Sequence, residues 1–195
     1  MALVQQQGPL VYGILFLIIF AETGLVFAPF LPGDSLLFVA GALCGLDALD
    51  INWLIPVLVL AAFSGDNTNY WIGRLIGMRL FHRAKGRFLK REHLEKTHAF
   101  YKKHGGKTVI VARFMPIIRT FAPFVAGIGA MRYRLFVFYS ALGSIAWISS
   151  LTLAGYFFGN IPFVKHNLTL IILAVILASF IPALIGFVRH HMQRR

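Results

Sequence analysis

The sequence predicts an all-α, polytopic membrane protein, and two observations lead to this fold class. Of the 195 residues, 58% are hydrophobic and 13% are charged, whereas about a quarter of the residues in a soluble domain carry a charge. Several apolar stretches also reach the length of about 20 residues that a helix needs to cross a bilayer. The excess of apolar surface therefore requires lipid as its solvent.

Three stretches are predicted to cross the membrane completely. Residues 53–73 contain a single acid, Asp66, and residues 135–158 and 168–188 contain no charged side chain. Each is long enough for one transmembrane helix.

Two further apolar stretches, residues 10–46 and 109–130, are poor uninterrupted spans because they contain Pro and Gly as well as ionised residues. A membrane tolerates broken backbone only where protein or water covers it. We therefore predict two re-entrant hairpins. Their expected breaks are Pro29, Pro32 and Gly33 in the first hairpin, and Pro116, Pro123 and Gly127 in the second.

Basic residues indicate the orientation. Residues 74–107 hold 11 of the 19 Lys and Arg residues against two acids, and so carry +9 of the formal net charge of +12. The positive-inside rule places this loop, and with it the basic tail 189–195, in the cytoplasm. Attraction to anionic lipid headgroups explains the loop better than nucleic-acid binding, because no recognition module is present. A helix at the membrane surface and a solvated connector both remain open for it.

Several other functions are disfavoured. We expect no secretory leader, because residues 1–9 contain no Lys or Arg. The single cysteine, Cys44, is interpreted as a packing residue. Residues 33–36, Gly-Asp-Ser-Leu, match the start of a serine-lipase motif with Ser35 as the nucleophile. No histidine that could act as its base precedes His82. No metal-ligand spacing and no phosphate-binding loop occurs, so we expect neither cofactor nor metal, and no enzymatic activity.

Four charged residues lie in the predicted hairpins: Glu22, Asp34, Arg113 and Arg119. Each costs at least about 2.5 to 3.5 kcal/mol on insertion scales, so charged residues at this depth indicate function by default. The first hairpin supplies only carboxylates and the second only guanidiniums. The alternative is a purely structural network that joins the two hairpins.

Two hairpins, each followed by a spanning helix, suggest an inverted repeat whose broken helices meet at a substrate site. Arg113 and Arg119 could grip a phosphate headgroup with their planar forks. Glu22 and Asp34 could load and release protons. For Asp66 the sequence leaves two roles open, a further proton carrier or local pairing with Asn67, Asn69 and Tyr70.

Three stretches resemble the signatures of the DedA family: residues 22–34, 65–77 and 113–127. Gly143, Trp147 and residues 155–159 extend the resemblance almost to the last helix. The resemblance implies a bacterial plasma-membrane protein with two opposed hairpins. Family members are associated with returning undecaprenyl phosphate across the membrane in dependence on the proton gradient, and related eukaryotic proteins scramble phospholipids. The family's functional acids and arginines match Glu22, Asp34, Arg113 and Arg119.

The function expected from the sequence is therefore proton-coupled transport of a lipid with a phosphate headgroup, a polyprenyl phosphate or a phospholipid. The alternatives are a proton-coupled exporter of cations or drugs, an uncoupled phospholipid scramblase, and a non-transporting membrane scaffold. Assembly into a homo-oligomer is compatible with the sequence.

Overall fold

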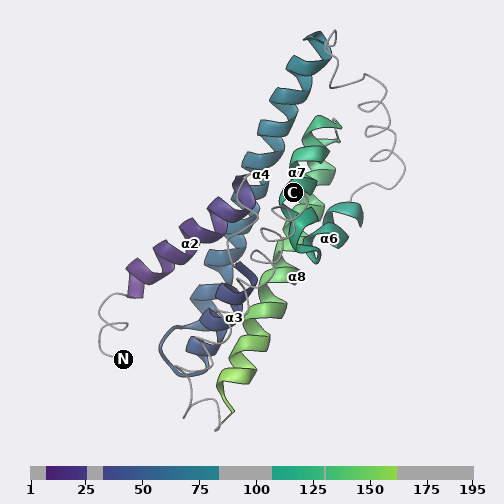
Figure 1. Cartoon of the computed structure of the whole chain (residues 1–195). Coiled ribbons are helices and arrows are strands. Elements are labelled where there is room, and N and C mark those ends of the chain that lie inside the picture. Colours follow the sequence, from purple (N-terminus) through teal and green to yellow (C-terminus); the bar gives the residue numbers. More distant parts are fainter. Residues whose placement is uncertain (1–7, 26–32, 84–106, 130, 162–195) are drawn as a thin grey trace, which may run out of the picture. The chain divides into compact units, whose positions relative to one another are not determined.

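A computed structural model describes residues 8–25, 33–83, 107–129 and 131–161. These residues are largely helical, with no strand among them (Figure 1). The helices are α2 (Gly8–Gly24), α3 (Gly33–Cys44), α4 (Ile51–Arg83), α6 (Lys107–Arg113), α7 (Pro116–Ile128) and α8 (Tyr133–Gly159). The all-α fold class is thus confirmed for the described part of the chain.

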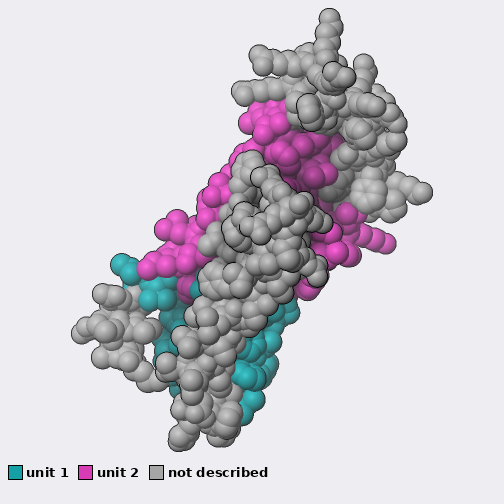
Figure 2. Space-filling view, viewed as in Figure 1, with its two compact units in different colours: residues 1–12, 30–55, 148–195 teal, residues 13–29, 56–147 magenta. Residues whose placement is uncertain are grey.

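The chain divides into two compact units (Figure 2). Unit 1 comprises residues 1–12, 30–55 and 148–195, and unit 2 comprises residues 13–29 and 56–147. Both α4 and α8 contribute residues to each unit. Each unit is described separately below.

One described helix, α8, is long and apolar enough to cross a membrane. Its bounds match the predicted crossing at 135–158 closely. Helix α4 is 33 residues long and includes the predicted crossing at 53–73, but it continues past Gly73 to Arg83, into the segment expected to be a loop. A polar run at residues 66–69 lowers its apolar character. The third predicted crossing, 168–188, and the tail 189–195 lie outside the described residues.

The two stretches predicted as hairpins each contain two short helices. The first stretch is interrupted between Gly24 and Gly33, and the second between Arg113 and Pro116. Proline at the start of α7 fits this break, because its missing N–H would have no intrahelical partner there. Pro29 and Pro32 lie outside the described residues. The re-entrant path of each pair remains a prediction.

Two of the predicted breaks need correction, because α7 runs through Pro123 and Gly127 without interruption. Pro123 has no N–H to offer the carbonyl of Arg119, and the next carbonyl, that of Thr120, accepts a hydrogen bond from Asn69 Nδ2 at 2.7 Å. A buried amide from α4 thus supports the backbone near the proline. Gly127 serves close packing instead of a break.

In unit 1, α3 and α8 pack backbone to backbone through glycines. A Cβ on Gly155 would collide with the carbonyl oxygen of Phe38, and one on Gly159 would lie 2.5 Å from the carbonyl oxygen of Ala42. A Cβ on Gly41, in α3, would likewise collide with the Thr152 carbonyl. The absence of side chains at these positions is what lets the two helices approach.

Unit 2 contains the same arrangement between α7 and α4. A Cβ on Gly73 would collide with the carbonyl oxygen of Phe124, and one on Gly127 would collide with that of Tyr70. Residues 38–41 and 124–127 are both Phe-Val-Ala-Gly, and in each unit this sequence packs against a helix with glycines four residues apart, at 155 and 159 or at 73 and 77. The duplicated contact supports the internal repeat expected from the sequence.

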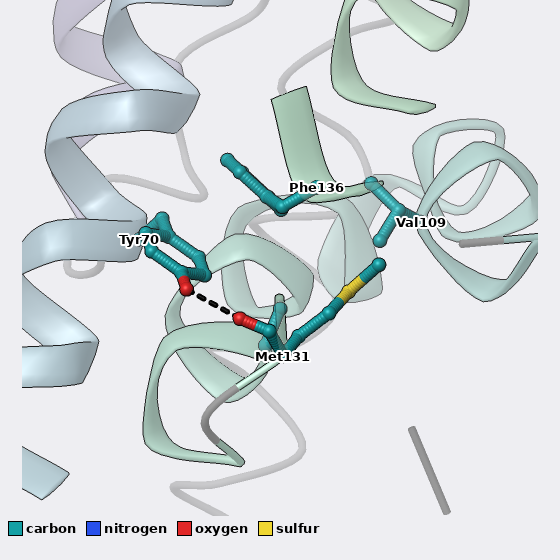
Figure 3. Packing of buried hydrophobic residues seen from close by; sticks show 5 residues of the cluster. Tyr70, Val109, Met131 and Phe136 are labelled. Carbon is teal, nitrogen blue, oxygen red and sulfur yellow. Dashed lines mark hydrogen bonds between the residues drawn. The ribbon is translucent and has the colours of Figure 1, made fainter. Parts of the chain in front are cut away.

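The apolar core of unit 2 surrounds Tyr70, with Val109, Ala126, Met131 and Phe136 packed nearby (Figure 3). The Tyr70 ring stacks on Phe136 at a centroid distance of 4.5 Å. Its hydroxyl donates to the Met131 carbonyl at 2.6 Å, so the buried polar atom of this ring is satisfied. The core therefore fixes α4 against the segment that joins α7 to α8.

We predict that Gly155→Ala destabilises the protein by about 1 to 3 kcal/mol, as overpacking does in well-packed cores. The added methyl group would meet backbone, which cannot move aside as a flexible side chain can. Gly13→Ala is the matched control, because no atom lies within 4 Å of the Cβ position there. Thermal unfolding in detergent measures both variants. Equal melting temperatures would contradict the close approach of α3 and α8.

Candidate functional site

Unit 2 contains a cluster of buried polar and charged side chains from five helices. They come from α2, α4, α6, α7 and α8, and their members are Glu22, Thr23, Asp66, Asn69, Arg113, Arg119, Thr120, Ser140 and Ser144. Placing so many polar groups away from water is costly unless they are paired.

The first ion pair joins α7 to α2. The Arg119 guanidinium contacts the Glu22 carboxylate through Nη2 and Oε1. Both side chains are almost completely buried, at 5% and 1% exposure. The guanidinium carbon of Arg119 also lies 4.4 Å from the centre of the Trp147 ring. A cation over an indole face gains further stabilisation, so Arg119 is held from two sides.

The second ion pair joins α6 to α4. Arg113 Nη2 contacts Asp66 Oδ2, and both side chains are 3% exposed. Ser140 on α8 completes this group, because its hydroxyl donates to Asp66 Oδ2 at 2.6 Å and accepts from Arg113 Nη2 at 3.3 Å. A Cβ on Gly143 would lie 2.9 Å from Arg113 Cδ. The glycine therefore leaves the space through which the Arg113 side chain passes.

Asn69, on α4, bridges the two helices that carry the first ion pair, α2 and α7. Its Nδ2 donates to the Thr23 carbonyl at 3.1 Å and to the Thr120 carbonyl at 2.7 Å. Thr23 adjoins Glu22, and Thr120 adjoins Arg119. One fully buried amide thus connects the backbone of α2 with that of α7, directly beside the first ion pair.

The structure brings together most of the residues that the sequence predicted. A carboxylate of the first predicted hairpin, Glu22, pairs with an arginine of the second, Arg119. Asp34 lies half-buried in unit 1, in the first turn of α3, where a negative charge favours the helix N-terminus.

The predicted local pairing of Asp66 with Asn67, Asn69 and Tyr70 is wrong. Its described partners are Arg113 and Ser140, whereas its three polar neighbours bond elsewhere: Asn67 to the Phe63 carbonyl, Asn69 to Thr23 and Thr120, and Tyr70 to Met131. Asn67 points in another direction from Asp66, whereas Asn69 and Tyr70, three and four residues further on, share its face of α4 but bond to other segments.

The sequence reasoning missed the roles of Ser140, Trp147 and Asn69 in this cluster. Ser140 and Ser144 were detectable in principle, since they are polar residues one turn apart in the uncharged stretch 135–159 of α8. In the sequence, Asn69 stands out only as a polar neighbour of Asp66. Its bridging role depends on the approach of two distant segments, which no local pattern encodes.

Arg113 has unused hydrogen-bonding capacity. Its Nε and Nη1 are buried and have no hydrogen-bond partner among the described residues, although a guanidinium offers five donors in a planar fork. Buried donors without partners are uncommon and indicate a strain reservoir, a ligand or a functional role. An oxyanion is the chemistry that would satisfy them. In the described ranges, no group of three or more His, Cys, Asp or Glu side chains could hold a metal ion.

We predict that Asn69→Ala destabilises the protein by about 1 to 3 kcal/mol for each carbonyl left without its donor. Asn67→Ala is the matched control from the same helix, because Asn67 is only half-buried, its Nδ2 donates within α4, and the hydrogen bond that its Oδ1 accepts from the Tyr133 hydroxyl is exposed. Thermal unfolding should show a clearly lower melting temperature for the Asn69 variant. Equal effects at the two positions would contradict the bridge between α2 and α7.

Comparison with known proteins gives a consistent result. The VTT domain model matches residues 31–157. Protein DedA of Escherichia coli K12 is 54% identical over 190 residues, which cover 96% of this chain and 87% of that protein. The uncharacterized membrane protein Rv0364 of Mycobacterium tuberculosis H37Rv is 46% identical over 93% of this chain and 80% of its own length.

A more distant relative, the inner membrane protein YghB of Escherichia coli K12, is 35% identical over 80% of this chain and 72% of its own length. No solved structure gives a significant match. The family model covers well over half of the chain, and the relatives are named as membrane proteins. The chain is therefore a membrane protein that belongs to the VTT-domain family, the family of DedA.

Proposed function

We propose that this protein moves a lipid with a phosphate headgroup, undecaprenyl phosphate first among the candidates, across the bacterial plasma membrane in a proton-coupled manner. The observation that carries the proposal is the unused hydrogen-bonding capacity of the buried Arg113 guanidinium. Two of its guanidinium nitrogens are buried without a hydrogen-bond partner in the described part of the chain, in a protein whose solvent is lipid. A phosphate oxygen is well suited to accept from either of them.

The buried cluster offers guanidinium donors that suit an anionic headgroup as cargo. Arg113 and Arg119 are balanced by Asp66 and Glu22, so the group as a whole is close to neutral. An incoming phosphate would have to compete with a carboxylate for its arginine. Guanidinium binds phosphate with two parallel hydrogen bonds, which makes arginine selective for this geometry.

The acids provide the route to proton coupling. A carboxylate that has lost its arginine to the phosphate would be left buried and charged, which is costly. Uptake of a proton removes that charge and the repulsion from the lipid anion. In this proposal Glu22 is one such acid, and Asp34 acts together with it.

The proposed orientation follows the basic residues. Segment 74–107 and the tail 189–195 face the cytoplasm, where Lys and Arg are enriched. The basic segment would contact anionic lipid headgroups there.

The proposal is tested by reconstitution into vesicles with a panel of labelled lipids. The panel contains a polyprenyl phosphate, a phosphatidate, and as neutral counterparts a polyprenol and a diacylglycerol. We expect rapid flipping of the phosphates, no acceleration for the neutral lipids, and a faster rate under an imposed pH gradient. Equal rates for phosphates and neutral lipids would indicate an unselective scramblase. No flipping of any lipid, with export of organic cations against a proton gradient, would favour a cation exporter.

A further inference from the structure

We infer that Asp66, with Ser140 as its hydrogen-bond partner, is a further proton-coupled acid, beside Glu22 and Asp34, and that it releases Arg113 to the phosphate headgroup. This inference rests on the proposed function and assigns to one ion pair a role in it. In the empty site Asp66 holds Arg113. Protonation of Asp66 would release the guanidinium, and binding of the lipid phosphate would favour that protonation.

The contacts of Arg113 are the first support. Its contacts with Asp66 and Ser140 both use Nη2, while Nε and Nη1 have no hydrogen-bond partner among the described residues. An oxyanion could therefore accept a hydrogen bond from Nε or from Nη1 while Asp66 holds Nη2, and release of Nη2 would complete a bidentate edge of the fork. The bound phosphate would then share one guanidinium with the Asp66 carboxylate. Two anions this close repel each other unless one of them takes up a proton.

Ser140 is the second support, because a hydroxyl can both donate and accept. It now donates to Asp66 Oδ2 and accepts from Arg113 Nη2. When Asp66 is protonated, rotation of the Ser140 hydroxyl would let it accept a hydrogen bond from the new O–H. Asp66 would thus keep a partner in both protonation states.

Few other groups face Asp66. Among the described residues, the charged side chains of the buried cluster are Arg113 from α6, Arg119 from α7 and Glu22 from α2, and the last two pair with each other. Asp66 therefore responds mainly to Arg113 and to whatever binds Arg113. Linkage requires the effect to be reciprocal: if protonation of Asp66 strengthens phosphate binding, phosphate binding must strengthen protonation by the same factor.

The test measures binding of a short-chain polyprenyl phosphate to the purified full-length protein in detergent, across about pH 5 to 9, for wild type and Asp66→Asn. The amide mimics the protonated acid. We expect Asp66→Asn to bind more tightly than wild type at high pH and to match it at low pH, with one fewer proton taken up per lipid bound. A curve parallel to that of wild type over the whole range would overturn the inference.

Ser140→Ala keeps the ion pair and serves if Asp66→Asn does not fold. The ionised Asp66 would lose one donor, so the pH dependence of binding should move toward higher pH by about one unit. Ser64→Ala is its control, because the Ser64 hydroxyl bonds to a carbonyl within its own helix. An unshifted curve for Ser140→Ala would also overturn the inference.

Arg113→Ala separates this inference from the proposed function. If that variant binds the polyprenyl phosphate as wild type does, Arg113 is not a phosphate ligand and the proposed function fails at this site. If it loses binding while Asp66→Asn follows the wild-type pH curve, the phosphate site stands and only the role of Asp66 is refuted.

Discussion

Replacing Arg113 or Arg119 with lysine is expected to reduce transport of a polyprenyl phosphate at least tenfold, although the positive charge is kept. A lysine offers a single ammonium and cannot present two parallel donors to a phosphate. One charge-assisted hydrogen bond contributes about 1.5 to 3 kcal/mol, and each 1.4 kcal/mol corresponds to about tenfold. Flipping in vesicles under an imposed pH gradient measures the effect.

Arg134→Lys is the control for both substitutions. Arg134 is exposed near the start of α8, so its replacement should leave the transport rate unchanged. Transport by Arg113→Lys and Arg119→Lys at the rate of the control would show that these positions supply charge balance and no phosphate contact.

Folding must be separated from transport in this experiment. A shorter lysine at position 119 would also lose the contact with the Trp147 ring and weaken the partnership with Glu22. Breaking a buried pair by removing one partner is strongly destabilising, whereas removing both is often tolerated. Thermal unfolding of each lysine variant therefore accompanies the transport assay, and the comparison is made only between variants that unfold near the wild-type temperature.

The sequence predicts the fold class and the last described helix well, because both depend on local properties. Residues 135–159 are apolar, uncharged and long, and α8 has nearly the expected bounds. The break before Pro116 was also predictable, since proline suits the first turn of a helix. Pro123 misled the same reasoning. Helix α7 continues through Pro123, and Asn69, from a distant part of the chain, donates a hydrogen bond to the nearby carbonyl of Thr120.

The candidate site shows a similar division. Membrane-embedded charge is so costly that Glu22, Arg113 and Arg119 stand out in the sequence alone. Which acid pairs with which arginine was not predictable. The choice of Asp66 for Arg113 depends on the space left by Gly143 and on the position of Ser140. Such choices are decided by tertiary packing, which a pattern along the chain does not encode.

The internal repeat predicted from the sequence is supported by a contact that occurs once in each unit. The alternation of broken and continuous apolar stretches indicated two related halves. The shared Phe-Val-Ala-Gly sequence at 38–41 and 124–127 was present in the sequence from the start. Its meaning becomes clear only when the glycines opposite it, Gly155 and Gly73, are seen to make room for the same backbone carbonyl.

Replacing Glu22 with glutamine is expected to separate lipid binding from energy coupling. The amide cannot take up or release a proton, but it can still accept a hydrogen bond from Arg119. Asp34→Asn removes the second proposed proton carrier in the same way. Each variant should therefore keep measurable binding of a polyprenyl phosphate while its transport no longer accelerates when a pH gradient is imposed.

The measurement compares flipping with and without the gradient, using the ratio of the two rates. Wild type should show a ratio clearly above one, and Glu22→Gln a ratio of about one, because the linkage between proton and lipid binding is lost when the titratable group is removed. Asp47→Asn is the control, since this acid lies in the turn between α3 and α4. If both amide variants respond to the gradient as wild type does, Glu22 and Asp34 do not couple transport to protons. The ion pair of Glu22 with Arg119 would then serve to orient the arginine, and transport would be driven by the lipid gradient alone.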